Sequence, residues 1–159
     1  MIEMNVDGIA FDAATMSPIV MLIDTEGRRA LPIWISQEQA KAIKLAIEQQ
    51  SSPRPLTHDL MVNILEQWDL ELCRVLIHSL QDNTYYATLQ TRHGDLTQDI
   101  DARPSDAIVL ALRLNAPIWV MEEVVADASI PADRDADEEE RRAFRQFLDN
   151  LNPGDFAQF

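Results

Sequence analysis

The fold is decided by residues 99–120, DIDARPSDAIVLALRLNAPIWV, because this stretch places a charged cluster directly before the most apolar helix-like run in the chain. From Ala107 to Leu112 it contains no polar residue, and a helix that is apolar on every side belongs in a protein core. Pro104 suits the first turn of such a helix, where a missing N–H has no cost, and Asn115 followed by Pro117 ends it. The stretch therefore predicts a buried central helix.

The segments around this helix predict strands and two further helices. Helices are expected over residues 37–49, after the capping-box spacing of Ser36 and Gln39, and from Pro55 to about Trp68, where an apolar stripe recurs every 3.6 residues. This order favours an α+β fold, with antiparallel or mixed β-sheets, a buried central helix and flanking helices, over a doubly wound α/β fold. Alternating or β-branched runs predict strands over 2–11, 18–23, 30–35, 70–80, 84–91, 96–102 and 117–120.

The composition changes near the C-terminal end. From Ala126 onward acidic residues accumulate around Pro131, as in a solvated linker. Residues 137–151 then have the apolar spacing of an amphipathic helix. We expect one domain over residues 1–130, followed by an acidic linker and a C-terminal amphipathic helix over residues 131–159.

The charge balance limits the kind of partner. The chain of 159 residues has 27 acidic and 13 basic side chains and a net charge of −14. Such a surface repels polyanions, so a polyanionic substrate needs a local cationic site, a bound metal, or both. Cys73 is the only cysteine, which excludes an internal disulfide and a cysteine-based zinc site. Without a signal peptide or a membrane-spanning apolar run, we expect a cytoplasmic protein that does not associate with membranes.

Two similar motifs each open a helix: Arg54-Pro55-Leu56-Thr57-His58-Asp59 and Arg103-Pro104-Ser105-Asp106. The motifs can be structural, since Pro, Ser or Thr, and Asp are all favoured at helix starts and the arginines can pair with carboxylates. They can instead share one cleft. Two helix N-termini and two guanidiniums would then hold phosphate oxygens, while carboxylates bind a divalent metal that activates water.

In the functional interpretation each residue type has a role. Asp59 and Asp106 are the expected catalytic bases or metal ligands, and His58 is an accessory acid or base. Arg54 and Arg103 are the expected phosphate clamps. The hydroxyl side chains expected to bind substrate beside them are Thr57 and Ser105.

Asp99 and Asp101 are second candidates for metal ligation. Period-two alternation puts both carboxylates on one face of the strand just before the central helix. The alternative is that they form a solvated strand face. The expected cofactor is Mg²⁺ or Mn²⁺, which prefer oxygen ligands, and no organic cofactor is expected.

Five short segments carry a resemblance: Pro32-Ile33-Trp34-Ile35, Arg54 to Asp59, Tyr85-Tyr86-Ala87, Asp101 to Ala107, and Ala116-Pro117-Ile118. In this order and spacing they resemble the bifunctional nuclease domain family, from about residue 2 to 130, and the C-terminal end is similar to bacterial members. The resemblance implies an α+β domain, often self-associated, that degrades both DNA and RNA. Where the family has Gly-x-x-Glu after the tryptophan strand, this chain has Ser36-Gln37-Glu38-Gln39, so no carboxylate role is assigned there.

The sequence is therefore compatible with two classes of function. The first is a metal-assisted nuclease that acts on DNA, RNA or both as a homo-oligomer. The second is a non-catalytic oligomeric module that binds a protein or a small anionic ligand, with the Arg-Pro motifs holding helices in place. An open cleft shared by Asp59, Asp106 and both arginines favours the nuclease. Pairing of these side chains beneath the core favours the module.

Overall fold

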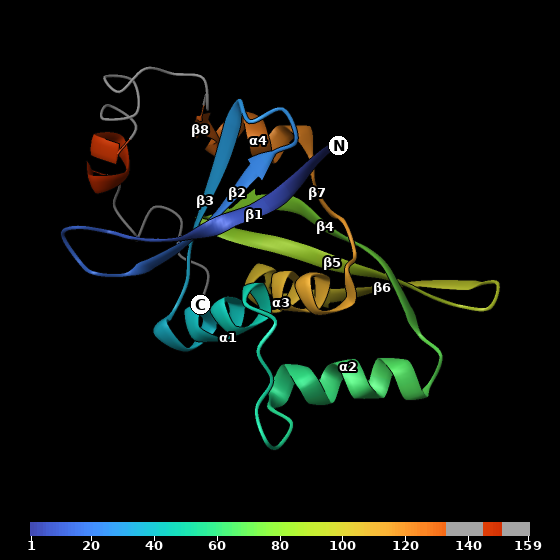
Figure 1. Ribbon diagram of the computed structural model, residues 1–159. Helices are drawn as coiled ribbons and strands as arrows, with labels where there is room; N and C mark the ends of the chain where they lie inside the picture. The colour runs from blue at the N-terminus through green and yellow to red at the C-terminus, as the bar shows by residue number, and fades with distance from the viewer. Residues whose placement is uncertain (133–144, 151–159) are drawn as a thin grey trace.

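The computed structural model describes residues 1–132 and 145–150, and it has the predicted α+β architecture (Figure 1). The described residues form one mixed sheet of eight strands in the order β6-β5-β4-β7-β1-β2-β3-β8. The predicted strands are confirmed, with ends that differ by at most two residues. The strands are β1 (Ile2–Phe11), β2 (Pro18–Asp24), β3 (Arg29–Trp34), β4 (Glu71–Gln81), β5 (Thr84–His93), β6 (Leu96–Ala102), β7 (Ile118–Val120) and β8 (Ile130–Pro131).

The sheet joins two antiparallel meanders through a short central strand. β1, β2 and β3 form the first meander, and β4, β5 and β6 form the second. β7 lies between them, parallel to β4 and antiparallel to β1. β6 forms one edge of the sheet, and the short β8 pairs with β3 at the other edge. All predicted strands therefore belong to one continuous sheet.

Of the helices in the described part of the chain, three lie on one side of the sheet, below it in Figure 1. The predicted capping box of the first helix is present, because the Ser36 hydroxyl accepts the Gln39 N–H at 3.2 Å and the Ser36 N–H donates to the Gln39 side chain at 2.8 Å. In the described part of the chain no helix is both long and apolar enough to cross a membrane. The three helices are α1 (Gln37–Ile47), α2 (Thr57–Gln67) and α3 (Pro104–Leu114).

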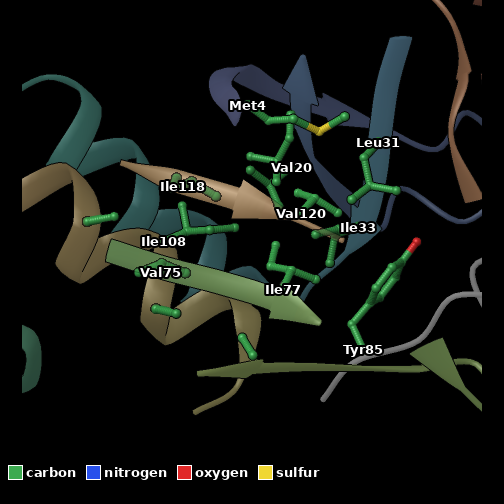
Figure 2. Packing of buried hydrophobic residues seen from close by; sticks show 14 of the residues in the cluster. Met4, Val20, Leu31, Ile33, Val75, Ile77, Tyr85, Ile108, Ile118 and Val120 are labelled. Carbon is green, nitrogen blue, oxygen red and sulfur yellow. The ribbon is translucent and has the colours of Figure 1, made fainter. Parts of the chain in front are cut away.

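The central helix predicted from the sequence is α3, and it is buried as expected. Its residues from Ala107 to Ala111 are at most 2% exposed. Figure 2 shows Ile108 packed near Val75 and Ile118 of the sheet. Asn115 ends the helix in the left-handed conformation, with φ 54°, which asparagine tolerates better than most residues. Because α3 is buried against the sheet, its first turn has a fixed position in the protein.

A short helix, α4 (Glu122–Ala128), is not predicted by the sequence pattern. Its apolar residues have the i, i+1, i+4 spacing of a helix face, but the helix is too short and too acidic for that periodicity to stand out. We expected a solvated linker from Ala126 onward, and this prediction is wrong for its first residues. Residues 126–128 belong to α4, and Ile130 pairs with Ala30 of β3. The buried side chains of α4 are Val124, Val125 and Ala128.

The C-terminal helix is predicted over residues 137–151, and the described part of it, residues 145–150, is helical. Residues 133–144 and 151–159, with the rest of the predicted linker and tail, lie outside the described residues. Leu148 packs against a second apolar cluster. That cluster consists of Ile19, Met21, Ala30, Trp34 and Ile130.

Helix α2 is confirmed, but its predicted apolar stripe is only partly a packing face. Leu65 is 9% exposed and is the buried residue of the helix. By contrast, Leu60 is 52% exposed, Ile64 is 49% exposed, and Trp68, directly after the helix, is 72% exposed. The 3.6-residue period therefore correctly predicted a helix, although much of its apolar stripe is exposed to solvent.

Candidate functional site

The first turns of α2 and α3 meet at the carboxylate of Asp106. His58, in the first turn of α2, places its Nε2 atom 2.8 Å from Asp106 Oδ1. Arg103, directly before α3, donates from Nε to Asp106 Oδ2 at 3.1 Å. His58 and Asp106 are 48 residues apart in the chain. The structure therefore brings parts of both Arg-Pro motifs into one cluster.

The start of α3 explains how Arg103 reaches Asp106. Arg103 has an extended backbone, with φ −70° and ψ 143°, and Pro104 provides the first helical residue with a φ that is already suitable. Asp106 then follows Arg103 at the i, i+3 spacing that lets side chains meet on a helix surface. A carboxylate in a first turn is also stabilised by the helix dipole.

The electrostatics of the cluster keep Asp106 ionised. The hydrogen bond from His58 lowers the pKa of the Asp106 carboxyl group below its ordinary value. Arg103 lowers the pKa further through a hydrogen bond and its charge, while partial burial acts in the opposite direction. Asp106 is consequently an acceptor at neutral pH and not a proton donor.

The cluster is partly open to solvent. The side chains of His58 and Asp106 are 19% and 27% exposed, and that of Arg103 is 55% exposed. Within the described residues, the second ring nitrogen of His58, Nδ1, makes no hydrogen bond. A carboxylate that holds one nitrogen of an imidazole orients the ring and leaves the other nitrogen for proton transfer. The arrangement can therefore provide an oriented base beside a guanidinium.

Asp59 belongs to a neighbouring pair and not to the Asp106 cluster. Its Oδ2 atom accepts the Leu56 N–H at 3.0 Å, and its Oδ1 atom lies 3.9 Å from the Nε of Arg113. Arg113 lies near the end of α3 and its side chain is 18% exposed. Arg113 is a site residue that no sequence motif indicated. Its signal in the sequence is a single cation after the apolar run of the central helix.

The predicted phosphate-binding residues have different environments. Arg54 and Thr57 are exposed near the start of α2, and Arg54 makes no ion pair among residues 1–132 and 145–150. Ser105 is 1% exposed, and its hydroxyl lacks a hydrogen-bond partner within the same residues. Arg54 and Thr57 are thus accessible to a ligand, whereas Ser105 is turned into the protein.

Asp99 and Asp101 lie on the side of the sheet that faces away from α3. Their cross-strand partners in β5 are Gln90 and Thr88. Leu89, between those partners, is buried in the core with α3. Because side chains alternate along a strand, the two carboxylates point away from that core. The structure does not bring them to His58 and Asp106.

The described residues do not include a group of three or more His, Cys, Asp or Glu side chains that could hold a metal ion. Asp106 is held by His58 and Arg103, and Asp59 by Leu56 and Arg113. The protein alone therefore does not supply a complete metal site in this arrangement. Metal dependence stays a prediction.

These features define an α+β domain with a polar cluster at the starts of two helices. The chain belongs to the bifunctional nuclease domain family, because the family model for the bifunctional nuclease domain matches residues 20–133. This match confirms the resemblance that the short motifs indicated.

Two groups of relatives support the same assignment. Uncharacterized proteins from two strains of Mycobacterium tuberculosis are 38% identical over 162 residues, which cover 97% of this chain and 97% of theirs. Bifunctional nuclease 2 from Oryza sativa subsp. japonica is 30% identical over 112 residues, which cover 69% of this chain and 34% of the rice protein. Bifunctional nuclease 1 from Oryza sativa subsp. indica is 26% identical over the same length.

Proposed function

We propose that this protein is a nuclease that hydrolyses phosphodiester bonds of DNA, RNA or both at His58, Asp106 and Arg103. The proposal rests on membership in the bifunctional nuclease domain family and on one observation. That observation is the 2.8 Å contact between His58 Nε2 and Asp106 Oδ1 beside the Arg103 guanidinium. These are the parts that a hydrolytic site for a phosphate ester requires.

In this proposal His58 is the general base. Asp106 accepts the Nε2–H of His58 and thereby favours the tautomer in which Nδ1 has a free lone pair. Nδ1 takes a proton from water as the water oxygen attacks phosphorus, and the bond from phosphorus to the leaving sugar oxygen breaks. The leaving oxygen takes a proton from solvent water, and His58 Nδ1–H releases its proton to solvent, which restores the neutral imidazole. Asp106 stabilises the imidazolium while it exists.

Two arginines are proposed to hold the phosphate. Arg103 uses its Nε for Asp106, so its terminal nitrogens remain for phosphate oxygens. Arg54 is exposed near the start of α2 and supplies a second cation. Because the chain as a whole has a net charge of −14, these local contacts act against a repulsive background. We therefore expect weak binding and a preference for single strands or ends.

Divalent-metal dependence is part of the proposal. Mg²⁺ is often bound by only one or two carboxylates, with substrate phosphates and water as its other ligands. Asp59 and Asp106 are the proposed protein ligands, and each would have to exchange one of its present contacts for the ion when substrate binds. A bound ion would neutralise phosphate charge and lower the pKa of coordinated water. Mg²⁺ or Mn²⁺ is therefore expected to increase the rate.

The test is cleavage of labelled single-stranded RNA and DNA by the purified protein with Mg²⁺, Mn²⁺ or EDTA. His58→Ala and Asp106→Asn should each reduce the rate by about 100-fold or more. Asp127→Asn, an exposed residue of α4, removes the same charge as Asp106→Asn at a distant position and should cleave like the wild type. Equal cleavage by all four proteins, or no cleavage by any, would refute this site.

A second candidate is the non-catalytic oligomeric module. The observation that favours it is that Asp106 and Asp59 already have cationic partners, as they would if they only fixed α2 against α3. Retained thermal stability together with complete loss of cleavage in His58→Ala favours the nuclease. Unfolding of both site variants without any wild-type cleavage favours the module. A cytoplasmic location and a homo-oligomeric state are proposed for either function.

A further inference from the structure

An apolar hollow lies at the far end of α2 from His58. It has a volume of about 290 Å³, and Trp68, whose side chain lines it, is 72% exposed. Leu96, which lines the same hollow, is 71% exposed, and neighbouring exposed apolar side chains of this size mark a candidate binding surface. The residues that line the hollow are Trp68, Leu70, Thr91, His93, Leu96 and Gln98.

The polar groups of the hollow suit a flat ring with a polar edge. His93 Nδ1 lies 3.2 Å from the backbone oxygen of Asp69, so Nδ1–H donates and a neutral ring keeps Nε2 as an acceptor. Among the described residues, the side-chain amide of Gln98 makes no hydrogen bond, so it offers both a donor and an acceptor. An apolar wall with a few polar groups is the usual composition of a small-ligand site.

The hollow and the His58 cluster are connected by two elements that run in opposite directions. Trp68 follows the end of α2 and Leu96 starts β6, and both line the hollow. At the other end, His58 in the first turn of α2 meets Asp106 and thereby Arg103, which directly follows β6. Figure 1 shows α2 and β6 running in these opposite directions. The ten residues from His58 to Trp68 correspond to about 15 Å, a span of a few nucleotides.

We propose that the hollow is a nucleobase subsite in which a base of a single-stranded nucleic acid stacks on Trp68 while a phosphate of the same strand lies at His58 and Arg103. This proposal rests on the proposed nuclease function. Stacking is tolerant of base identity and needs no basic surface, so it suits a chain with a net charge of −14. The subsite would supply affinity that the two arginines cannot supply alone.

The binding test uses fluorescence anisotropy with a labelled oligonucleotide of about ten residues, which exceeds the proposed span. Trp68→Ala should weaken binding about tenfold or more, whereas Trp68→Phe should keep most of the affinity because it still stacks. A strand of equal length without bases should bind the wild type as weakly as the intact strand binds Trp68→Ala. Equal affinity of wild type and Trp68→Ala for the intact strand would overturn the subsite.

A matched control separates stacking from self-association. Glu66→Ala changes an exposed residue of the same helix outside the hollow and should leave affinity within about twofold, the usual effect of surface changes. Light scattering of each variant measures its oligomeric state. If Trp68→Ala changes only the oligomer mass and not the affinity, the hollow is an interface between copies of the chain and the proposal fails.

Kinetics distinguish failure of the subsite from failure of the nuclease. Bis(p-nitrophenyl) phosphate is a small diester that can reach His58 without occupying the hollow. Trp68→Ala should raise KM for the oligonucleotide about tenfold and leave hydrolysis of the small diester unchanged. Cleavage with an unaltered KM for the oligonucleotide overturns the subsite alone. Absence of all cleavage, with Trp68-dependent binding intact, overturns the nuclease and retains the base subsite.

Discussion

At the scale of single residues, Asp106 connects the two motifs that the sequence shows only as similar patterns. One carboxylate oxygen accepts from His58 of α2 and the other accepts from Arg103, so a single side chain orients both a base and a cation. Asp59 ends the first Arg-Pro motif as Asp106 ends the second, but its charged partner is Arg113. The two aspartates therefore have different chemistry despite equivalent sequence positions.

The lowered pKa of Asp106 predicts a specific dependence of stability on pH. A carboxyl group with a lower pKa in the folded state stabilises the protein above its unfolded pKa, which is about 3.9. That contribution is lost as the pH falls through this value toward the folded pKa. Between about pH 5 and pH 3 the wild type should therefore lose more stability than Asp106→Asn. Urea unfolding at each pH measures the difference, and an equal loss of stability in both proteins would contradict the lowered pKa of Asp106.

The ion pair between Arg113 and Asp59 is expected to be weaker than the Asp106 cluster. Its Nε to Oδ1 distance of 3.9 Å exceeds hydrogen-bonding range, and the partly exposed Asp59 carboxylate keeps its hydrogen bond from the Leu56 N–H without Arg113. Arg113→Met keeps the length of the side chain and should change the free energy of unfolding by about 1 kcal/mol or less. Chemical denaturation provides the measurement. A loss above about 3 kcal/mol would show that Arg113 is essential for neutralising Asp59.

At the scale of elements, α3 and α2 differ in how much of their apolar surface is covered. Leu110 of α3 is fully buried, whereas Leu60 of α2 is 52% exposed. Leu110→Ala should therefore cost about 2–5 kcal/mol of unfolding free energy, and the same substitution at Leu60 less than about 1 kcal/mol. Urea denaturation of the two variants checks this. A large effect at Leu60 in the monomer would mean that α2 is packed more tightly than its exposure indicates.

Local signals in the sequence predicted most helices and strands, but not which of them pack against each other in space. Residues close together in the sequence form the capping box at Ser36 and set the two ends of the central helix, at Pro104 and Asn115. These features can therefore be predicted from the sequence alone. The contact of His58 with Asp106 depends on how α2 crosses α3, which no local pattern specifies. The direction of Asp99 and Asp101 also depends on a distant partner. Their closeness to α3 in the sequence predicted that they lie near the site, but the pairing of β6 with β5 points them to the face of the sheet away from α3.

At the scale of the whole molecule, the acidic surface predicts an unusual salt dependence for nucleic-acid binding. If Arg54 and Arg103 are the main phosphate contacts, about two counterions are released from a single strand, and the slope of log K against log salt should be about −1.4. A stacked base at Trp68 adds affinity without changing the slope. Binding titrations between low and moderate salt measure it. A slope steeper than about −3 would require phosphate contacts beyond these two arginines.

The place of β7 in the sheet has a consequence for the order in which the chain folds. The meanders β1–β3 and β4–β6 each consist of neighbours in the sequence, so each can pair as soon as it leaves the ribosome. The three residues of β7, Ile118–Val120, join the two meanders by pairing with both β4 and β1. Until those residues emerge, the inner edges of both meanders remain unpaired and open to wrong partners. Closure of the sheet is therefore a late event, which follows synthesis of nearly the entire domain.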